Sequence, residues 1–207
     1  MANYNQPSCK ICRRNRVKLF LKGARCFSAK CAIEKRNTPP GPRKIMLRKL
    51  SEYGKRLREK QKIRCFYNVT DKLLGRYFKE ASSRKGIAGH NLITIFETRL
   101  DNVLYRSNFV RSRYEGRQLI RHGHFKVGSQ KVDIPSYRVK VGEEISYVPN
   151  GKKTIMEFNN KDNSTAPSWI SVDEKNKSIK VLDVPQRSQV DVPVEEQLVV
   201  EFLRNRL

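Results

Sequence analysis

Four of the five cysteines stand at a spacing that suits a tetrahedral metal ion. Cys9, Cys12, Cys26 and Cys31 read C-x2-C-x13-C-x4-C, two close pairs separated by a loop. Two short turns that each deliver two thiolates are typical of a structural zinc site. The alternatives are two disulfides or four unrelated thiols, and disulfides need an oxidising compartment for which the sequence carries no address. We therefore expect one Zn²⁺ on these four cysteines, which would supply folding free energy to a small segment.

Basic residues beside these thiols are expected to favour the ionised sulfur, namely Lys10, Arg13, Arg14 and Arg25. Because protein fills all four ligand positions, the site would be structural and not catalytic. The fifth cysteine, Cys65, stands alone in the stretch KIRCFYNV and is expected to be an ordinary buried or partly buried thiol.

Positive charge is the second feature with chemical consequences. The 207 residues carry 44 Lys and Arg against 20 Asp and Glu, a formal net charge of +24. The excess is +20 in residues 1–90, +4 in residues 91–148 and zero in residues 149–207. Such self-repulsion requires a polyanionic partner, either nucleic acid or an anionic membrane. No apolar run approaches the ~20 residues of a membrane span, and the N-terminus lacks the apolar core of a secretory signal.

The first elements that must position these groups are predicted to be helices, which follow a connector. A rigid connector over residues 37–42, with three prolines and a glycine, precedes a basic helical stretch over residues 43–64 in which Gly54 is a candidate break. Only two glutamates of this stretch can pair with its many cations, so it is more basic than a solvated helix face requires. Thr70 followed by Asp71 predicts the start of another helix.

A second group of elements follows, first helices and then strands. Residues 91–107 show an amphipathic pattern that predicts one helix. Ser112 and Glu115 form a capping box that predicts a helix from Arg113, which should end at Gly123. Short strands are expected over residues 125–127, 132–134, 137–141, 145–148, 169–172 and 180–182. Residues 149–166 are expected to be a loop, and residues 195–205 a C-terminal helix.

The run from Arg99 to Ile145 closely resembles the αL RNA-binding module named after bacterial ribosomal protein S-four. The first helix of the module is matched by RLDNVLYR, and the second helix by SR together with RQLI. The turn and hairpin of the module are matched by RHGH and IPSY. The resemblance extends to KLSEYG, LREKQK, PPG and the terminal VVEF, so it covers nearly the whole chain. The four-cysteine N-terminus is similar to the zinc-bearing subgroup of that ribosomal family.

This resemblance completes the expected architecture. The fold class is α+β: a mainly helical N-terminal domain with a zinc knuckle, then an αL RNA-binding module with a small, mostly antiparallel sheet and a C-terminal helix. The domain ranges are a zinc knuckle with its Pro-rich connector (1–42), a basic helical domain (43–96) on which the helix 195–205 packs, and the αL module with its sheet (97–190).

The expected RNA contacts come from two basic surfaces. In the αL module, Arg113, Arg117 and Arg121 repeat every four residues as one basic stripe, and the N-terminus of their helix would face a phosphate. Tyr137 could stack on a base; for His122 and His124, contact with RNA and simple packing are equally plausible. The predicted contacts near the N-terminus are Arg13, Arg14, Lys44, Arg48, Tyr53, Arg56, Arg58, Lys60, Lys62 and Arg64. Those in the module are Arg106, Arg111, Ser112, Arg113, Arg117, Gln118, Arg121, His122, His124, Lys126, Tyr137 and Arg138.

The resemblance implies a structural protein of the small ribosomal subunit in the cytoplasm. Its partners would be small-subunit rRNA, the fifth small-subunit protein, and mRNA near the entry channel. It would nucleate assembly of the 5′ domain of the rRNA and would contribute to translational accuracy. No enzymatic activity, small-molecule substrate or membrane partner is expected. The alternatives are a stand-alone RNA-binding regulator, which would not explain the cysteine segment, and an RNA-modifying enzyme. An enzyme would need a large catalytic domain, and only 59 residues follow Val148. No phosphate-binding glycine motif occurs either.

Overall fold

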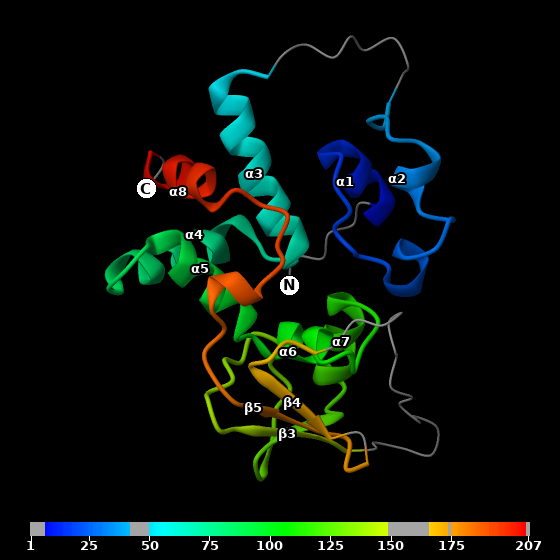
Figure 1. The fold of residues 1–207 in the computed structure, drawn as a ribbon, viewed down its shortest axis with the longest axis vertical. Coiled ribbons are helices and arrows are strands. Elements are labelled where there is room, and N and C mark those ends of the chain that lie inside the picture. The colour runs from blue at the N-terminus through cyan, green and yellow to red at the C-terminus, as the bar shows by residue number, and fades with distance from the viewer. Residues whose placement is uncertain (1–6, 42–49, 149–165, 174, 206–207) are drawn as a thin grey trace. The chain divides into compact units, whose positions relative to one another are not determined.

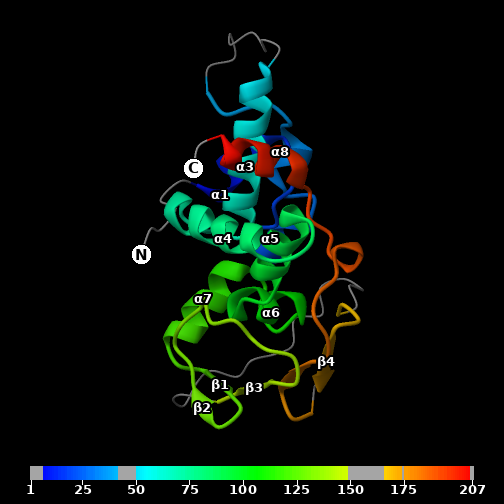
Figure 2. The ribbon, with the colours of Figure 1, turned by 90° about the vertical axis from the view of Figure 1, so that its left-hand side faces the viewer.

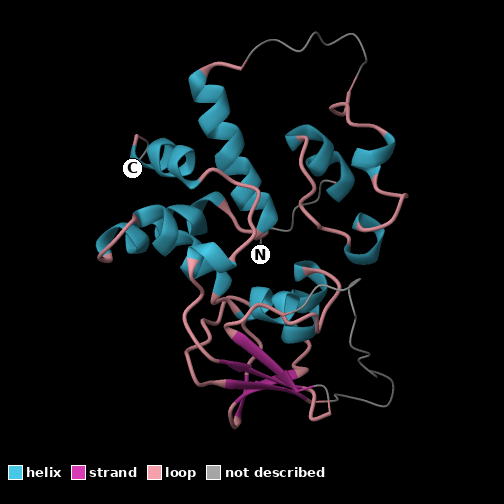
Figure 3. Cartoon of the chain, in the orientation of Figure 1, coloured by secondary structure: helices cyan, strands magenta, loops and turns pink. Residues whose placement is uncertain are grey.

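The computed structural model describes residues 7–41, 50–148, 166–173 and 175–205, and the chain divides into two compact units (Figure 1). The first unit combines Met1–Leu92 with Val192–Leu207, and the second is Ile93–Asp191. Figure 3 shows that the described strands gather in one sheet, which belongs to the second unit. A mainly helical N-terminal part and a small antiparallel sheet confirm the predicted α+β fold class.

The longer helices of the first unit begin at their own capping residues. Ser51 and Thr70 accept the backbone N–H groups of Gly54 (3.1 Å) and Leu73 (3.2 Å), which satisfies donors that have no partner inside the helix. Gly54 therefore lies in the first turn of a continuous helix and does not divide it. The described helices of this unit are α1 (Ser8–Asn15), the short 3-10 helix η1 (Gly23–Cys26), α2 (Ala32–Lys35), α3 (Glu52–Phe66), α4 (Asp71–Ser83), the beginning of α5 (Ala88–Glu97) and α8 (Glu196–Arg204).

The C-terminal helix α8 packs against α3. Its apolar residues Val199, Phe202 and Leu203 are buried. The backbone N–H of Glu195, which precedes the helix, donates to Oε2 of Glu59 in α3 at 3.2 Å, across 136 positions of sequence. Two helices that lie far apart in the sequence thus pack together in the first unit.

The second unit packs helices against an antiparallel sheet. Its strands are β1 (Phe125–Val127), β2 (Gln130–Lys131), β3 (Glu144–Tyr147), β4 (Ile170–Asp173) and β5 (Ser178–Val181), in the order β2-β1-β3-β5-β4. The helices α6 (Leu100–Arg106) and α7 (Arg113–Arg121) lie together on one side of this sheet (Figure 2). A short 3-10 helix, η2 (Arg187–Gln189), follows the last strand. Phe125, Trp169 and Ile179 are almost fully buried in the core.

The stretch predicted as one helix over residues 91–107 is two helices, α5 and α6. Between them the backbone of Arg99 is extended and forms an isolated bridge with Arg138. The predicted strand over residues 137–141 is therefore wrong, because this stretch pairs with the break between two helices instead of with the sheet.

The strand expected over residues 132–134 lies earlier in the chain. Gly128 adopts a positive φ of 57°, and Val127 pairs directly with Gln130, so the turn is only two residues long. Strand pairing then ends at Lys131. The loop expected over residues 149–166 lies, except for residue 166, outside the described residues.

Candidate nucleic-acid interface

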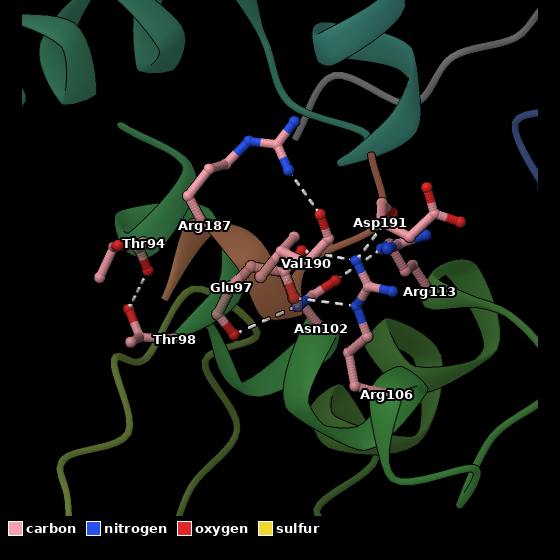
Figure 4. A network of polar contacts seen from close by, with 9 residues as sticks. All are labelled: Thr94, Glu97, Thr98, Asn102, Arg106, Arg113, Arg187, Val190 and Asp191. Atoms are coloured by element: carbon pink, nitrogen blue, oxygen red, sulfur yellow. Dashed lines mark hydrogen bonds and ion pairs between the residues drawn. The ribbon is translucent and has the colours of Figure 1, made fainter. Parts of the chain in front are cut away.

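The charged residues of the αL module are held by a buried network around Glu97 (Figure 4). The Glu97 carboxylate, which is fully buried, accepts hydrogen bonds from Nδ2 of Asn102 (2.7 Å) and from the guanidinium of Arg106 (2.9 Å to each oxygen). Arg106 also donates to the backbone carbonyl of Asp191 at 3.2 Å. Arg113 donates from Nε to Oδ1 of Asn102 at 2.7 Å. Arg106 and Arg113 therefore hold α5, α6 and α7 together.

A second buried carboxylate, Asp101, lies between Arg99 and Arg117. Asp101 is 2% exposed, and its Oδ2 is 2.8 Å from Arg99 Nη2 and 2.6 Å from Arg117 Nε. Burial alone would raise the pKa of this carboxyl, but the two guanidinium charges outweigh burial and hold the pKa below its ordinary value. This carboxylate ties α7 to the start of α6.

Arg113, the first arginine of the predicted basic stripe on α7, is buried. This side chain is 5% exposed, and its guanidinium carbon lies 4.1 Å from the centre of the Tyr105 ring. Arg117 is mostly buried and paired with Asp101, so of the three arginines only Arg121 is exposed. Sequence spacing places residues four apart on one helix face, but it does not say whether that face meets water or another helix.

The N-terminus of α7 carries its own acidic partner. Ser112 Oγ accepts the N–H of Glu115 at 3.2 Å, as the capping box predicts. The Glu115 carboxylate accepts the N–H of Arg111 at 2.6 Å, so a negative side chain occupies part of the place where a phosphate was expected.

The predicted contacts of the module differ in their access to solvent. Tyr137 is partly buried, and its hydroxyl donates to Glu143 Oε1 at 3.1 Å. The exposed members are Arg111, Gln118, Arg121 and His122; the partly buried ones are Arg106, Arg117, Lys126, Tyr137 and Arg138; and the buried ones are Ser112, Arg113 and His124.

Many cations of α3 are paired with acids that lie elsewhere in the fold. Arg56 contacts Glu201 of α8 at 2.8 Å. Lys60, which is 3% exposed, contacts Asp71 of α4 at 2.6 Å. Arg64 also pairs with Asp71, whereas Lys62 pairs with Glu59 of the same helix. Tertiary contacts therefore pair Arg56, Lys60 and Arg64 of this helix with acids that lie outside it. Tyr53 is exposed, and the predicted contacts Lys44 and Arg48 lie outside the described residues.

An open cleft of the first unit remains strongly cationic. The α1 residues Lys10 and Arg14 and the α3 residues Arg58 and Arg64 line it, and no acidic residue is among its described lining. Within the described part of the chain, Lys10, Arg14 and Arg58 make no ion pair. Lys10 was missed as a candidate RNA contact, because its position next to Cys9 suggested only an effect on the thiol.

Arg13 has a structural role beside this cleft. Its Nε donates to the carbonyl of Thr38 at 2.9 Å, which fastens the connector to α1. Pro40 and Gly41 of the same connector then line the cleft.

The four N-terminal cysteines surround one small pocket and carry free thiols. Burial raises the pKa of Cys12 to about 11 and also raises the pKa of Cys26. The expectation that basic neighbours favour the ionised sulfur is thus wrong for these two. Four thiols are the donor set that a closed Zn²⁺ site uses. Among the described residues, however, no three or more His, Cys, Asp or Glu side chains are grouped closely enough to hold a metal ion. Cys65 is buried, as expected.

No described helix has the length and apolar composition that crossing a membrane requires. The fold is of α+β class, and the cationic cleft of the first unit is the kind of surface that nucleic-acid-binding proteins present to phosphates. A family profile described as "Ribosomal protein S4/S9 N-terminal domain" matches residues 3–97, and one described as "S4 domain" matches residues 98–145. The chain belongs to the ribosomal protein S4 family, now named uS4.

Relatives match along the full length of the chain. The small ribosomal subunit protein uS4 of Ruminiclostridium cellulolyticum is 47% identical, over 98% of this chain and 99% of the relative. The protein of the same name from Acetivibrio thermocellus is also 47% identical with the same coverage. That of Dictyoglomus turgidum is 44% identical over 98% of both chains.

Proposed function

We propose that this protein is a structural component of the small ribosomal subunit that binds small-subunit rRNA. The observation that carries the proposal is the cleft of the first unit, whose described lining holds four cations and no acid. Such a cleft suits a phosphate backbone, because the affinity of RNA-binding proteins comes largely from neutralised phosphates. The full-length similarity to proteins named small ribosomal subunit protein uS4 supports the choice of rRNA as the polyanion.

The rest of the assignment follows from the same family. The protein acts without catalysing a reaction, and it nucleates folding of the 5′ domain of 16S-type rRNA. Its neighbours are small-subunit proteins, notably the fifth, and mRNA near the entry channel, where it contributes to accuracy of translation. Co-sedimentation with the small subunit in a high-magnesium sucrose gradient tests this location, and recovery of the protein only in the ribosome-free fraction would contradict it.

The cleft can be tested with purified protein and a transcript of the 5′ domain. Arg14→Ala with Arg58→Ala should weaken binding and reduce the slope of log K against log salt by about 1.4–1.8, since each phosphate contributes about 0.7–0.9. Lys72→Ala with Arg76→Ala is the matched control, because it removes two exposed charges from α4. Equal effects of both double variants would show that only net charge matters and would contradict the cleft.

We also propose that Cys9, Cys12, Cys26 and Cys31 hold one structural Zn²⁺. Their spacing and the pocket that they share support this, as does the preference of Zn²⁺ for four thiolate ligands in closed sites. The ion would neutralise thiolates that burial disfavours and would hold the two cysteine pairs together.

A further inference from the structure

The connector that follows α2 has few means of its own to keep a fixed path. The backbone is already extended at Arg36, where α2 ends, and Pro39 and Pro40 have no N–H group to donate. Within the described part of the chain, residues 37–41 form no hydrogen bond between backbone groups. A side chain from elsewhere in the fold must therefore hold this segment.

Arg13 of α1 is that side chain. Its Nε donates to the carbonyl of Thr38 at 2.9 Å and its Nη2 to the carbonyl of Pro39 at 3.4 Å. The planar guanidinium group carries its donors in a fixed fork, so it can bind two consecutive carbonyls at once, whereas the single ammonium group of a lysine has no such fork. Among the described residues Arg13 makes no ion pair, and these two carbonyls orient its guanidinium group.

The residues that follow the two carbonyls form part of the cationic cleft. Pro40 and Gly41 line it together with Lys10 and Arg14 of α1, and Arg13 itself is absent from the described lining. Gly41 has a φ of 127°, a conformation that side-chain-bearing residues rarely adopt. The connector thus turns in a specific way at the cleft, directly after the two carbonyls that Arg13 holds.

We propose that Arg13 is a positioning residue for RNA binding. It holds residues 38–41, here called the connector wall, in place before RNA arrives, and it does not itself contact RNA. A segment that must be ordered during binding lowers affinity, and a wall that is already ordered avoids this cost. The inference rests on the proposed function of the cleft and adds to it a residue that acts through the shape of the cleft.

A positioning role and a phosphate contact differ in two measurable quantities. A phosphate contact contributes about 0.7–0.9 to the slope of log K against log salt, and a lysine can replace an arginine as the charge that makes it. A guanidinium group that binds two carbonyls contributes nothing to that slope, and a lysine cannot replace it. Arg13 stands next to Arg14 in the sequence, and the two side chains should differ in both quantities.

The test measures binding of the full-length protein to the 5′-domain transcript over a series of potassium chloride concentrations. Arg13→Ala should weaken binding about 5- to 30-fold, the range for loss of one or two hydrogen bonds, and should leave the salt slope unchanged. Arg13→Lys should lose as much affinity as Arg13→Ala, although it keeps the charge. Lys72→Ala removes one exposed charge from α4, outside the cleft, and should bind like wild type.

The position of the connector wall can be measured without RNA. Arg36 is exposed and directly precedes the connector, so trypsin cleavage after Arg36, quantified by mass spectrometry, reports release of the segment. Cleavage should be several-fold faster in Arg13→Ala and Arg13→Lys. Arg14→Ala should reduce the salt slope but leave this cleavage rate unchanged. Circular dichroism should show that the helix content of the Arg13 variants equals that of wild type.

A double-mutant cycle links the connector wall to RNA binding. Pro40→Gly makes the same segment more flexible and should weaken binding in the wild-type protein. In the Arg13→Ala background the segment is already released, so Pro40→Gly should have little further effect. Additive losses would show that the two residues act independently and would overturn the proposal.

The outcomes separate this inference from the function on which it rests. A wild-type protein that does not bind the transcript overturns both. Wild-type binding with an unaffected Arg13→Ala variant overturns the positioning role alone. A smaller salt slope in Arg13→Ala, or wild-type affinity in Arg13→Lys, also overturns it, because Arg13 would then be one more phosphate contact. Loss of helix content in the Arg13 variants would show a general role in folding and would contradict the proposal as well.

Discussion

Replacement of Asp101 by Asn tests whether a buried carboxylate holds the αL module together. The change keeps the size of the side chain and removes the negative charge that faces Arg99 and Arg117. The side chains of Asp101 and Arg99 are 2% and 3% exposed, so water cannot replace the lost partner. Loss of one member of a buried ion pair typically costs about 3–5 kcal/mol. We expect Asp101→Asn to lower the free energy of unfolding of the second unit by this amount.

The dependence of this effect on pH follows from the direction of the pKa shift. The folded protein holds the pKa of Asp101 below its ordinary value, which is about 3.9 in an unfolded chain. The contribution of the ionised carboxyl to stability is therefore complete above that value and is lost as pH falls through the lower folded pKa. The difference in stability between wild type and Asp101→Asn should be constant near neutral pH and should shrink in acid.

Urea unfolding monitored by Trp169 fluorescence measures this difference, because Trp169 is buried in the same unit. Asp133→Asn is the matched control, since Asp133 is exposed, and its effect should stay within about 0.5 kcal/mol. If Asp101→Asn unfolds at the same urea concentration as the control, the carboxylate does not hold the helices together and the reasoning fails.

Three other perturbations have defined expected results. Arg113→Ala with Arg117→Ala should lower the stability of the second unit in the same urea titration, because both guanidinium groups bind buried acceptors. Unchanged stability would show that these two arginines do not stabilise the fold. Gly123→Ala should cost at least about 1 kcal/mol in that titration, since the residue has a φ of 75° and its new Cβ would meet Lys131. Mass spectrometry of protein purified without chelator should show one bound zinc that a chelator removes; two disulfides instead would contradict the zinc site.

The local elements of the fold could largely be predicted from the sequence. Thr70 and Ser112 mark the starts of α4 and α7, because side chains that accept backbone N–H groups act within a few residues. The amphipathic pattern near the C-terminus likewise predicts α8. Residues 91–107 were mispredicted as one helix because the break at Arg99 depends on Arg138, a residue far along the chain.

The candidate site was predictable in composition but not in arrangement. Arg113 and Lys60 have the sequence pattern of surface cations, because the acceptors that bind them lie eleven positions away in the sequence. In the fold, Asn102 binds Arg113 and Asp71 binds Lys60, and both cations are buried. Only the strand pairing places Lys131 opposite Lys126 and over the backbone of Gly123.

The sequence by itself determined the helix caps, the spacing of the four cysteines, the large positive charge and the membership of a ribosomal family. These are properties of residue types and short spacings, which no long-range contact alters. Only the tertiary structure decided which cations remain available to RNA. Three carboxylates pair with arginines that lie at least nine positions away in the sequence, namely those of Glu97, Asp101 and Glu201. Pairing at such distances is set by packing alone.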